Sequence, residues 1–325
     1  MENTIMMTVN QTADWLKERD NYLILTHRRP DGDTLGCAGA LAQSLLEQGK
    51  TAYILFNPEV TPRYARFVED HFAPEAWVPD HIITIDTASY DLFPKNGEEY
   101  IDNITLCIDH HPSNTYYAEY TYIDSTAASC GEIIYNLIVA MGGSINVKIA
   151  ERLYVALSTD TGCFAFANTT ANTLRTAALL IEAGASYREL NKELFRTRTL
   201  GRIKIEGMIF SGLEFYCDGA VAISSISRKM IEASNATEDD LDDIASIPGS
   251  VQGVHVGVTI RELTSESDCK VSIRTGALVN AHSVCAHFGG GGHPMAAGFS
   301  MEKSIAEIKA ELLEVLKEEL GSGEV

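Results

Sequence analysis

The chain has 325 residues, of which 45% are hydrophobic and 22% charged, and its formal net charge is −20. This length favours two domains, and the charge argues against a broad surface for long nucleic acid while leaving room for a small phosphorylated substrate. We find no bilayer-spanning run and no secretory signal, and seven scattered cysteines fit a reducing compartment, so we expect a cytoplasmic protein with no membrane partner.

Four apolar runs in the first half predict buried strands, at 21–26, 53–56, 81–86 and 104–109. Between the first two, 34–48 predicts a helix that is rich in small residues at its start. Runs that are apolar throughout and separated by helical patterns indicate a parallel sheet covered on both faces. Ligands bind such sheets beyond the carboxyl ends of the strands.

Helical spacing of apolar residues follows in 131–141, 147–158 and 171–183, and we expect Asp160 at the end of one of these helices. The later part of the chain alternates in pattern and predicts an α+β domain. Its expected strands and closing helix are 220–226, 255–262, 270–275, 296–301 and 304–319.

The predicted fold is therefore α/β, with an N-terminal parallel-sheet domain and a smaller C-terminal α+β domain. We expect the first domain at 1–190, a helical linker at 191–210 and the second domain at 211–325.

Acidic residues and histidines follow three of the predicted strands. His27, Asp31 and Asp33 come after the first strand, Asp86 ends the third, and the segment 109–111 follows the fourth. Carboxylates gathered without Lys or Arg repel each other unless a cation neutralises them. Carboxylate oxygens and imidazole nitrogens suit Mn, Mg, Fe or Zn, so the pattern predicts a metal site.

Each motif alone also has an ordinary explanation. The first could be a strand-to-helix loop with Asp33 or Thr34 as N-cap, Asp86 a turn former, and Asp160 a common helix-terminal residue. Two consecutive histidines after a buried strand are harder to explain by packing. Because adjacent residues point in different directions, we expect at most two of 109–111 to bind metal directly.

A run of four glycines, 289–292, precedes His293 and Pro294. Glycines let backbone N–H groups approach an anion closely, and the alternative is a flexible linker. Arg274, on a neighbouring predicted strand, is a candidate phosphate clamp, with a surface ion pair as the alternative.

Together these segments resemble the DHH phosphoesterase superfamily. Asp109-His110-His111 is the name-giving motif, and 27–33, Asp86 and Asp160-Thr161-Gly162 match the other motifs in order. Residues 289–298 look like the signature of the DHH-associated domain, first type. The two-domain layout looks most like the branch of nanoRNases and 3′-phosphoadenosine-5′-phosphate phosphatases.

The resemblance implies two divalent metal ions, Mn²⁺ first, with Mg²⁺ or Co²⁺ as alternatives. It implies that one ion is held by His27, Asp31 and Asp86, and the other by Asp33, Asp86, His110 and Asp160. His111 would contact the scissile phosphate, and Asp109 would support the site from behind. Substrate would be held across an interdomain cleft by Arg274, Gly290, Gly291, Gly292 and His293.

The implied activity is hydrolysis of short oligoribonucleotides, pApA and 3′-phosphoadenosine 5′-phosphate. The resemblance also implies a homodimer. The alternatives are a cyclic-di-AMP phosphodiesterase, an inorganic pyrophosphatase of the same superfamily, and a nucleotide-binding protein without turnover. Relatives often carry Arg close after the Asp-Thr-Gly motif, whereas this chain has Cys163, Phe164 and Ala165, a departure that bears on substrate range.

Overall fold

The computed structural model describes residues 4–241, 243–276 and 278–322. The chain divides into two compact units, 1–197 and 198–325. Among the described residues, no helix combines the length and the apolar composition that crossing a membrane requires.

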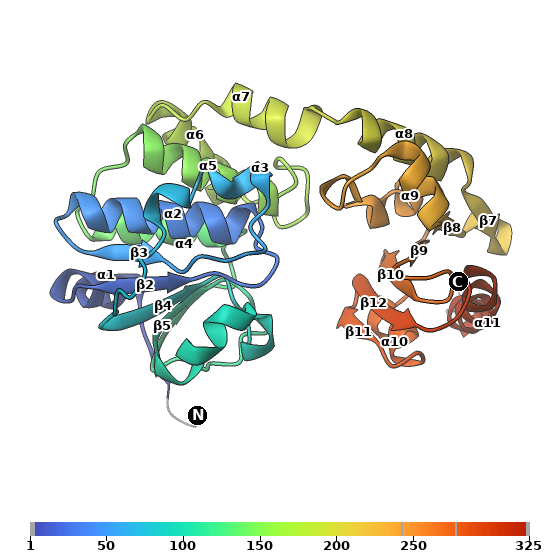
Figure 1. Cartoon of the computed structure of the whole chain (residues 1–325), viewed down its shortest axis with the longest axis horizontal. Coiled ribbons are helices and arrows are strands. Elements are labelled where there is room, and N and C mark those ends of the chain that lie inside the picture. The colour runs from blue at the N-terminus through green and yellow to red at the C-terminus, as the bar shows by residue number, and fades with distance from the viewer. Residues whose placement is uncertain (1–3, 242, 277, 323–325) are drawn as a thin grey trace. The chain divides into compact units, whose positions relative to one another are not determined.

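The first unit is built on six parallel strands in the order β1-β6-β5-β4-β2-β3, which confirms the predicted parallel sheet (Figure 1). The strands are β1 (Ile5–Met6), β2 (Tyr22–Leu25), β3 (Ala52–Ile54), β4 (His81–Ile85), β5 (Ile104–Asp109) and β6 (Tyr120–Ile123). The edge strand β1 and its neighbour β6 were not predicted, because β1 has two residues and β6 alternates tyrosine with other side chains.

Alternate residues of β2 enter two different cores. Tyr22 and Ile24 pack into the large core formed with the helices, whereas Leu23 and Leu25 pack into a smaller core on the opposite face. Burial on both faces explains why the strand is apolar at every position. The smaller core is completed by Phe93, directly after the 3₁₀ segment η2 (Tyr90–Leu92), and by Tyr100 and Ile101 of the 3₁₀ segment η3 (Lys95–Asn103).

The helices of the first unit are α1 (Val9–Glu18), α2 (Gly32–Glu47), α3 (Pro62–Ala65), α4 (Cys130–Ala140), α5 (Val147–Asp160), α6 (Ala171–Glu182) and α7 (Tyr187–Asn191). Four of them, α2, α4, α5 and α6, follow the predicted segments closely, whereas α1 and α3 were not predicted. Asp160 is the last residue of α5, as expected.

Small residues on α2 allow its backbone to lie almost against that of α5. A Cβ placed on Gly36 would lie 2.3 Å from the carbonyl oxygen of Arg152, and one on Gly32 would lie 2.5 Å from the hydroxyl of Thr159. Neither position accommodates a side chain, so these glycines fix the separation of the two helices.

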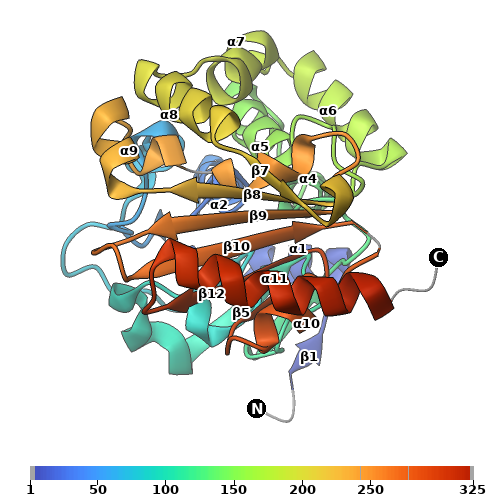
Figure 2. The same cartoon turned by 90° about the vertical axis from the view of Figure 1, so that its right-hand side faces the viewer.

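The second unit is a mixed sheet in the order β11-β12-β10-β9-β8-β7, with β8 and β9 parallel and the other pairs antiparallel (Figure 2). Its strands are β7 (Glu214–Tyr216), β8 (Val221–Ile226), β9 (Val256–Glu262), β10 (Cys269–Thr275), β11 (Gly291–His293) and β12 (Ala296–Met301). Its helices are α8 (Leu200–Ser211), α9 (Arg228–Ser234), α10 (Ala281–Ala286) and α11 (Ile305–Ser322).

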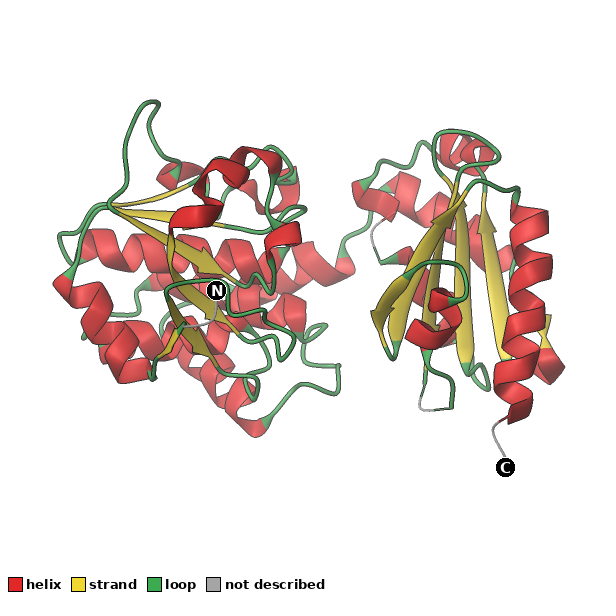
Figure 3. Ribbon diagram, turned by 90° about the horizontal axis from the view of Figure 1, so that it is seen from below, coloured by secondary structure: helices red, strands yellow, loops and turns green. Residues whose placement is uncertain are grey.

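The two faces of this second sheet differ in character. Val258, Val271 and Ile273 point into a core that is closed by α10 and α11, and the long α11 runs beside the strands (Figure 3). The residues between them, such as Thr259 and Ser272, point to the other face. The alternation of apolar and polar residues along β9 and β10 therefore reflects a sheet with one buried face and one polar face.

Candidate metal centre

The carboxyl edge of the first sheet gathers the predicted ligands. His27 follows β2, Asp86 follows β4 and Asp109 ends β5, so parallel strands deliver all three to one edge. Asp31 is the N-cap of α2, where it accepts the N–H groups of Asp33 at 3.0 Å and Thr34 at 3.2 Å. The cap is therefore Asp31, and neither Asp33 nor Thr34, because the helix begins at Gly32.

Asp33 is held by a second helix as well as by its own. Its carboxylate accepts N–H groups from Cys130 at 2.8 Å and Gly131 at 3.1 Å, at the beginning of α4. The thiol of Cys37 donates to it at 3.3 Å. The side chain is 1% exposed, so these contacts fix its direction, and helix N-termini favour a negative charge there.

Asp86 has a left-handed backbone with φ of 57°, a conformation that non-glycine residues seldom adopt and that clusters at functional sites. Its N–H group donates to the carbonyl of Ile108 at 3.0 Å. Its Oδ1 atom is buried and has no hydrogen-bond partner. A buried carboxylate oxygen without a partner is costly, and a bound cation would remove that cost.

The separations of His27 and His110 from the neighbouring carboxylates are wider than usual hydrogen bonds. His27 Nε2 lies 3.7 Å from Asp31 Oδ1 and 3.9 Å from Asp86 Oδ2. His110 Nε2 lies 3.4 Å from Asp86 Oδ1 and 3.7 Å from Asp160 Oδ2. Ligands that are each about 2.1 Å from one ion lie roughly 3–3.5 Å or more apart, so these gaps fit a cation between the atoms better than a direct bond.

Four overlapping groups of ligand atoms each lie within 4.8 Å of one another. They are His27, Asp31 and Asp86; Asp33, His110 and Asp160; Asp86, His110 and His111; and Asp33, Asp86 and Cys130. The structure thus brings together all six residues proposed as metal ligands. Asp86 belongs to three of the groups, as a bridging carboxylate requires, and Cys130 is a neighbour that the sequence did not single out.

The electrostatics of the cluster also call for positive charge. Burial raises the pKa values of Asp33 and Asp86 well above their usual range, and neighbouring carboxylates raise them further. Burial acts to lower the pKa of His27, but Asp31 and Asp86 raise it to about 9. Protons held in this way occupy the places where a divalent cation would neutralise the same carboxylates.

Asp109 supports His111 from below. Its carboxylate is fully buried and lies 2.8 Å from His111 Nδ1, while Asn114 donates to its other oxygen at 2.7 Å. Burial acts to raise the pKa of Asp109, yet hydrogen bonds from His111 and Asn114 hold it below its usual value. The ring of His111 is thereby oriented, with Nε2 left for another partner. Asn114 was missed because nothing in the sequence links it to the motif.

The predicted substrate residues lie in the second unit. Arg274 is on β10, and the register places it opposite Ala296, which in turn is opposite His293 on β11. Arg274 and His293 therefore share one face of the sheet. The glycine run proved to be partly a strand and not a loop, since Gly291 and Gly292 form β11. A Cβ on Gly292 would lie 2.6 Å from the carbonyl oxygen of Ala296, so close strand packing explains this glycine.

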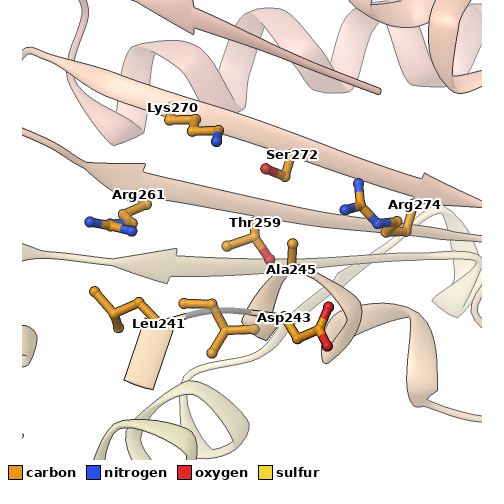
Figure 4. A pocket seen from close by; sticks show the side chains of 9 residues that line it. Leu241, Asp243, Ala245, Thr259, Arg261, Lys270, Ser272 and Arg274 are labelled. Carbon is orange, nitrogen blue, oxygen red and sulfur yellow. The ribbon is translucent and has the colours of Figure 1, made fainter. Parts of the chain in front are cut away.

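Next to Arg274 the same face carries a hollow of about 180 Å³ (Figure 4). Arg261 and Lys270 form its other cationic walls, and Thr259 and Ser272 lie on its floor. Arg261 is held by both carboxylate oxygens of Glu238, at 2.6 and 2.7 Å. The hollow therefore combines three cationic side chains and two hydroxyl groups with the carboxylate of Asp243.

Carboxylates and histidines at the carboxyl edge of this parallel sheet form a candidate site for divalent metal ions in an α/β domain. Residues 21–157 match the DHH family, N-terminal domain, and residues 218–322 match the DHHA1 domain. The chain belongs to the DHH family of phosphoesterases, which confirms the resemblance drawn from its motifs.

The relatives cover nearly the whole chain. The Bifunctional oligoribonuclease and PAP phosphatase NrnA of Thermus thermophilus is 31% identical over 91% of this chain and 89% of its own length. The protein of the same name from Bacillus subtilis is 29% identical over 87% and 90%. An exopolyphosphatase-related protein from Bacteroides fragilis shares the fold, with a TM-score of 0.82, 21% identity and coverage of 96% and 95%.

Proposed function

We propose that this protein is a manganese-dependent phosphoesterase that hydrolyses short oligoribonucleotides, pApA and 3′-phosphoadenosine 5′-phosphate. The observation that carries the proposal is the ligand cluster around Asp86, whose buried Oδ1 lacks a partner. The substrates follow from relatives named oligoribonuclease and PAP phosphatase over about nine-tenths of both chains.

The cluster would hold two ions. His27, Asp31 and Asp86 would form one set, and Asp33, His110 and Asp160, with Asp86 shared, the other. Two divalent ions in such a site lower the pKa of water and neutralise charge on the phosphate that is attacked. Mn²⁺, Mg²⁺ and Co²⁺ all accept carboxylate and imidazole ligands, and Mn²⁺ is our first choice.

The chain's own groups would position the substrate. Asp109 holds the ring of His111 through Nδ1 at 2.8 Å, so that Nε2 would contact the scissile phosphate. In the second unit, Arg274, His293 and the strand formed by Gly291 and Gly292 would bind phosphate and sugar groups. The guanidinium of Arg274 suits a phosphate because its planar fork donates two parallel hydrogen bonds.

The test is Mn²⁺-dependent hydrolysis of a substrate panel. The panel holds 3′-phosphoadenosine 5′-phosphate, pApA, a five-nucleotide RNA, a long single strand, cyclic-di-AMP and pyrophosphate. We expect turnover of the first three that falls as length increases. Preference for cyclic-di-AMP or pyrophosphate would overturn the substrate assignment, and two bound metals without any turnover would indicate a binding protein.

A matched pair of variants links the activity to the cluster. Asp86→Asn removes one negative charge at the centre, whereas Asp124→Asn removes one from the turn after β6, outside every ligand group. We expect the first variant to lose activity and bound metal, and the second to retain both.

A further inference from the structure

A cavity in the first unit lies beside the metal-ligand loop and takes no part in the site described above. Its volume is about 680 Å³, within the range of pockets that enclose small molecules. It is bounded by Arg28 and Arg29, directly after the ligand His27, and by residues of η2 and η3. We propose that this cavity binds one nucleotide of the substrate, with its base on Tyr90 and its phosphate at Arg28 and Arg29. This inference rests on the proposed function, because it assigns part of a nucleotide substrate.

Hydrogen bonds join the cavity wall to the metal centre. His27 Nδ1 lies 2.8 Å from the carbonyl oxygen of Arg28, and the N–H group of Arg28 donates to the carbonyl of Leu92 at 2.6 Å. The next residue, Arg29, has a left-handed backbone with φ of 49°, which this loop must hold in place. The backbone of Arg28 is therefore fixed between the proposed metal ligand His27 and η2, which places the wall of the cavity directly beside the ligand loop.

Tyr90 offers a fixed aromatic surface in the cavity. Its hydroxyl donates to the carbonyl of Tyr117 at 3.1 Å, and the two rings pack with centroids 5.0 Å apart. The residue is still 36% exposed. A ring that is anchored at its hydroxyl and open on one side suits base stacking, which every nucleobase can make.

The charges of the lining fit a nucleotide better than a bare anion. Arg28, Arg29 and Lys95 are balanced by three acids. Of these acids, Glu59 lies 3.8 Å from Arg29 and Asp91 accepts the hydroxyl of Ser89 at 2.5 Å, while Glu98 also lines the wall. Cations serve the phosphate, and carboxylates accept the N–H groups on the edge of a base. Inorganic phosphate alone would bring no N–H donors and would leave these carboxylates without a partner on the ligand.

The decisive experiment is a cycle between protein and substrate. It compares pApA with the two analogues that lack one base each, on the wild-type enzyme and on Tyr90→Ala. We expect removal of one particular base to raise KM about tenfold in the wild type and to have no further effect in Tyr90→Ala. Tyr90→Phe should restore the wild-type KM, and kcat should change less than twofold throughout. If removing the base raised KM by the same factor in Tyr90→Ala as in the wild type, the proposal would be overturned.

Two control variants carry matched side chains. Phe56 is 56% exposed, packs against Phe72 with ring centroids 5.3 Å apart and does not line the cavity, so Phe56→Ala should leave KM unchanged. The double variant Arg175→Ala/Arg188→Ala, on α6 and α7, is the control for Arg28→Ala/Arg29→Ala, which we expect to raise KM for pApA about tenfold and to weaken its salt dependence.

A second measurement separates failure of this inference from failure of the proposed function. Quenching of 2-aminopurine riboside 5′-monophosphate reports binding without turnover. Quenching by the wild type that is lost in Tyr90→Ala would support the cavity even if pApA is not hydrolysed. No quenching, or equal quenching by both proteins, would refute it even if pApA is hydrolysed through the metal centre.

Discussion

The proposed metal centre of the first unit and the cationic face of the second unit are built on opposite principles. Asp33 and Asp86 are 1% and 4% exposed; the carboxylate of Asp33 accepts backbone N–H groups of α4, and the backbone of Asp86 donates to the carbonyl of Ile108. On the second sheet, Arg274 and Lys270 are exposed side chains on one strand, with hydroxyl groups between them. Changes at the first region should therefore act almost all-or-none, and changes at the second should act by degrees.

The sharpest test of this contrast is Asp86→Ala. This carboxylate belongs to three ligand groups, so its loss should lower turnover of pApA by at least about 10³-fold and reduce the bound metal. Turnover should be measured together with metal content by elemental analysis. A variant that binds two metals and keeps the full rate would end the assignment of this cluster as the catalytic centre.

A smaller loss is expected for Asp109→Asn. The amide would keep the shape of the side chain but lose the charge that orients His111. Losing a partner that orients a residue of a metal site typically lowers activity by about 10–100-fold. The rate should fall while both metals remain bound, as metal analysis and steady-state kinetics would show. If the variant lost its metals instead, Asp109 would be a ligand and not a support.

The pH dependence of metal binding probes the same buried charges. In the metal-free protein His27 has a pKa of about 9, so below this value it carries a proton that a metal ion must displace. Affinity should therefore fall as the pH is lowered from 9, by up to about tenfold per pH unit for each proton released. Calorimetry in buffers of different ionisation enthalpy counts the protons, and zero released at pH 7 would contradict the expectation.

The smallest effect is expected on the second sheet. Arg274→Ala should raise KM for a short RNA about tenfold, the order expected for one charge-assisted contact, and leave kcat nearly unchanged. The slope of log affinity against log salt should become shallower by about one. An all-or-none loss of kcat here would erase the contrast between the two regions.

The proposed ligands of the first unit could be predicted from the sequence because a parallel sheet brings the residues after its strands to one edge. Strands that are apolar throughout imply a parallel sheet, and the residues after β2, β4 and β5 then meet at one edge. The contacts of Asp33 with α4 and of Asn114 with Asp109 could not be predicted in this way. They join residues through side-chain directions and helix positions that no periodicity encodes.

The same limit explains two differences in detail. The glycine run at 289–292 is compatible with a loop and with a strand. Its strand conformation depends on the pairing of β11 with β12, which the sequence pattern does not show. Tyr90 lies in a stretch without clear periodicity. Its position beside the loop that follows β2 depends on how the segment 90–103 folds over the second face of the sheet, which the sequence does not predict.

Because α2 and α5 lie almost in contact at Gly36, we expect the protein to tolerate no larger residue at this position. Asp33 lies on α2 and Asp160 on α5, so the spacing of the helices is also the spacing of two proposed metal ligands. A single methyl group at Gly36 would meet the carbonyl of Arg152 and force the helices apart. In a genetic screen for lost activity, this glycine would therefore score with the ligands, although it can bind neither metal nor substrate.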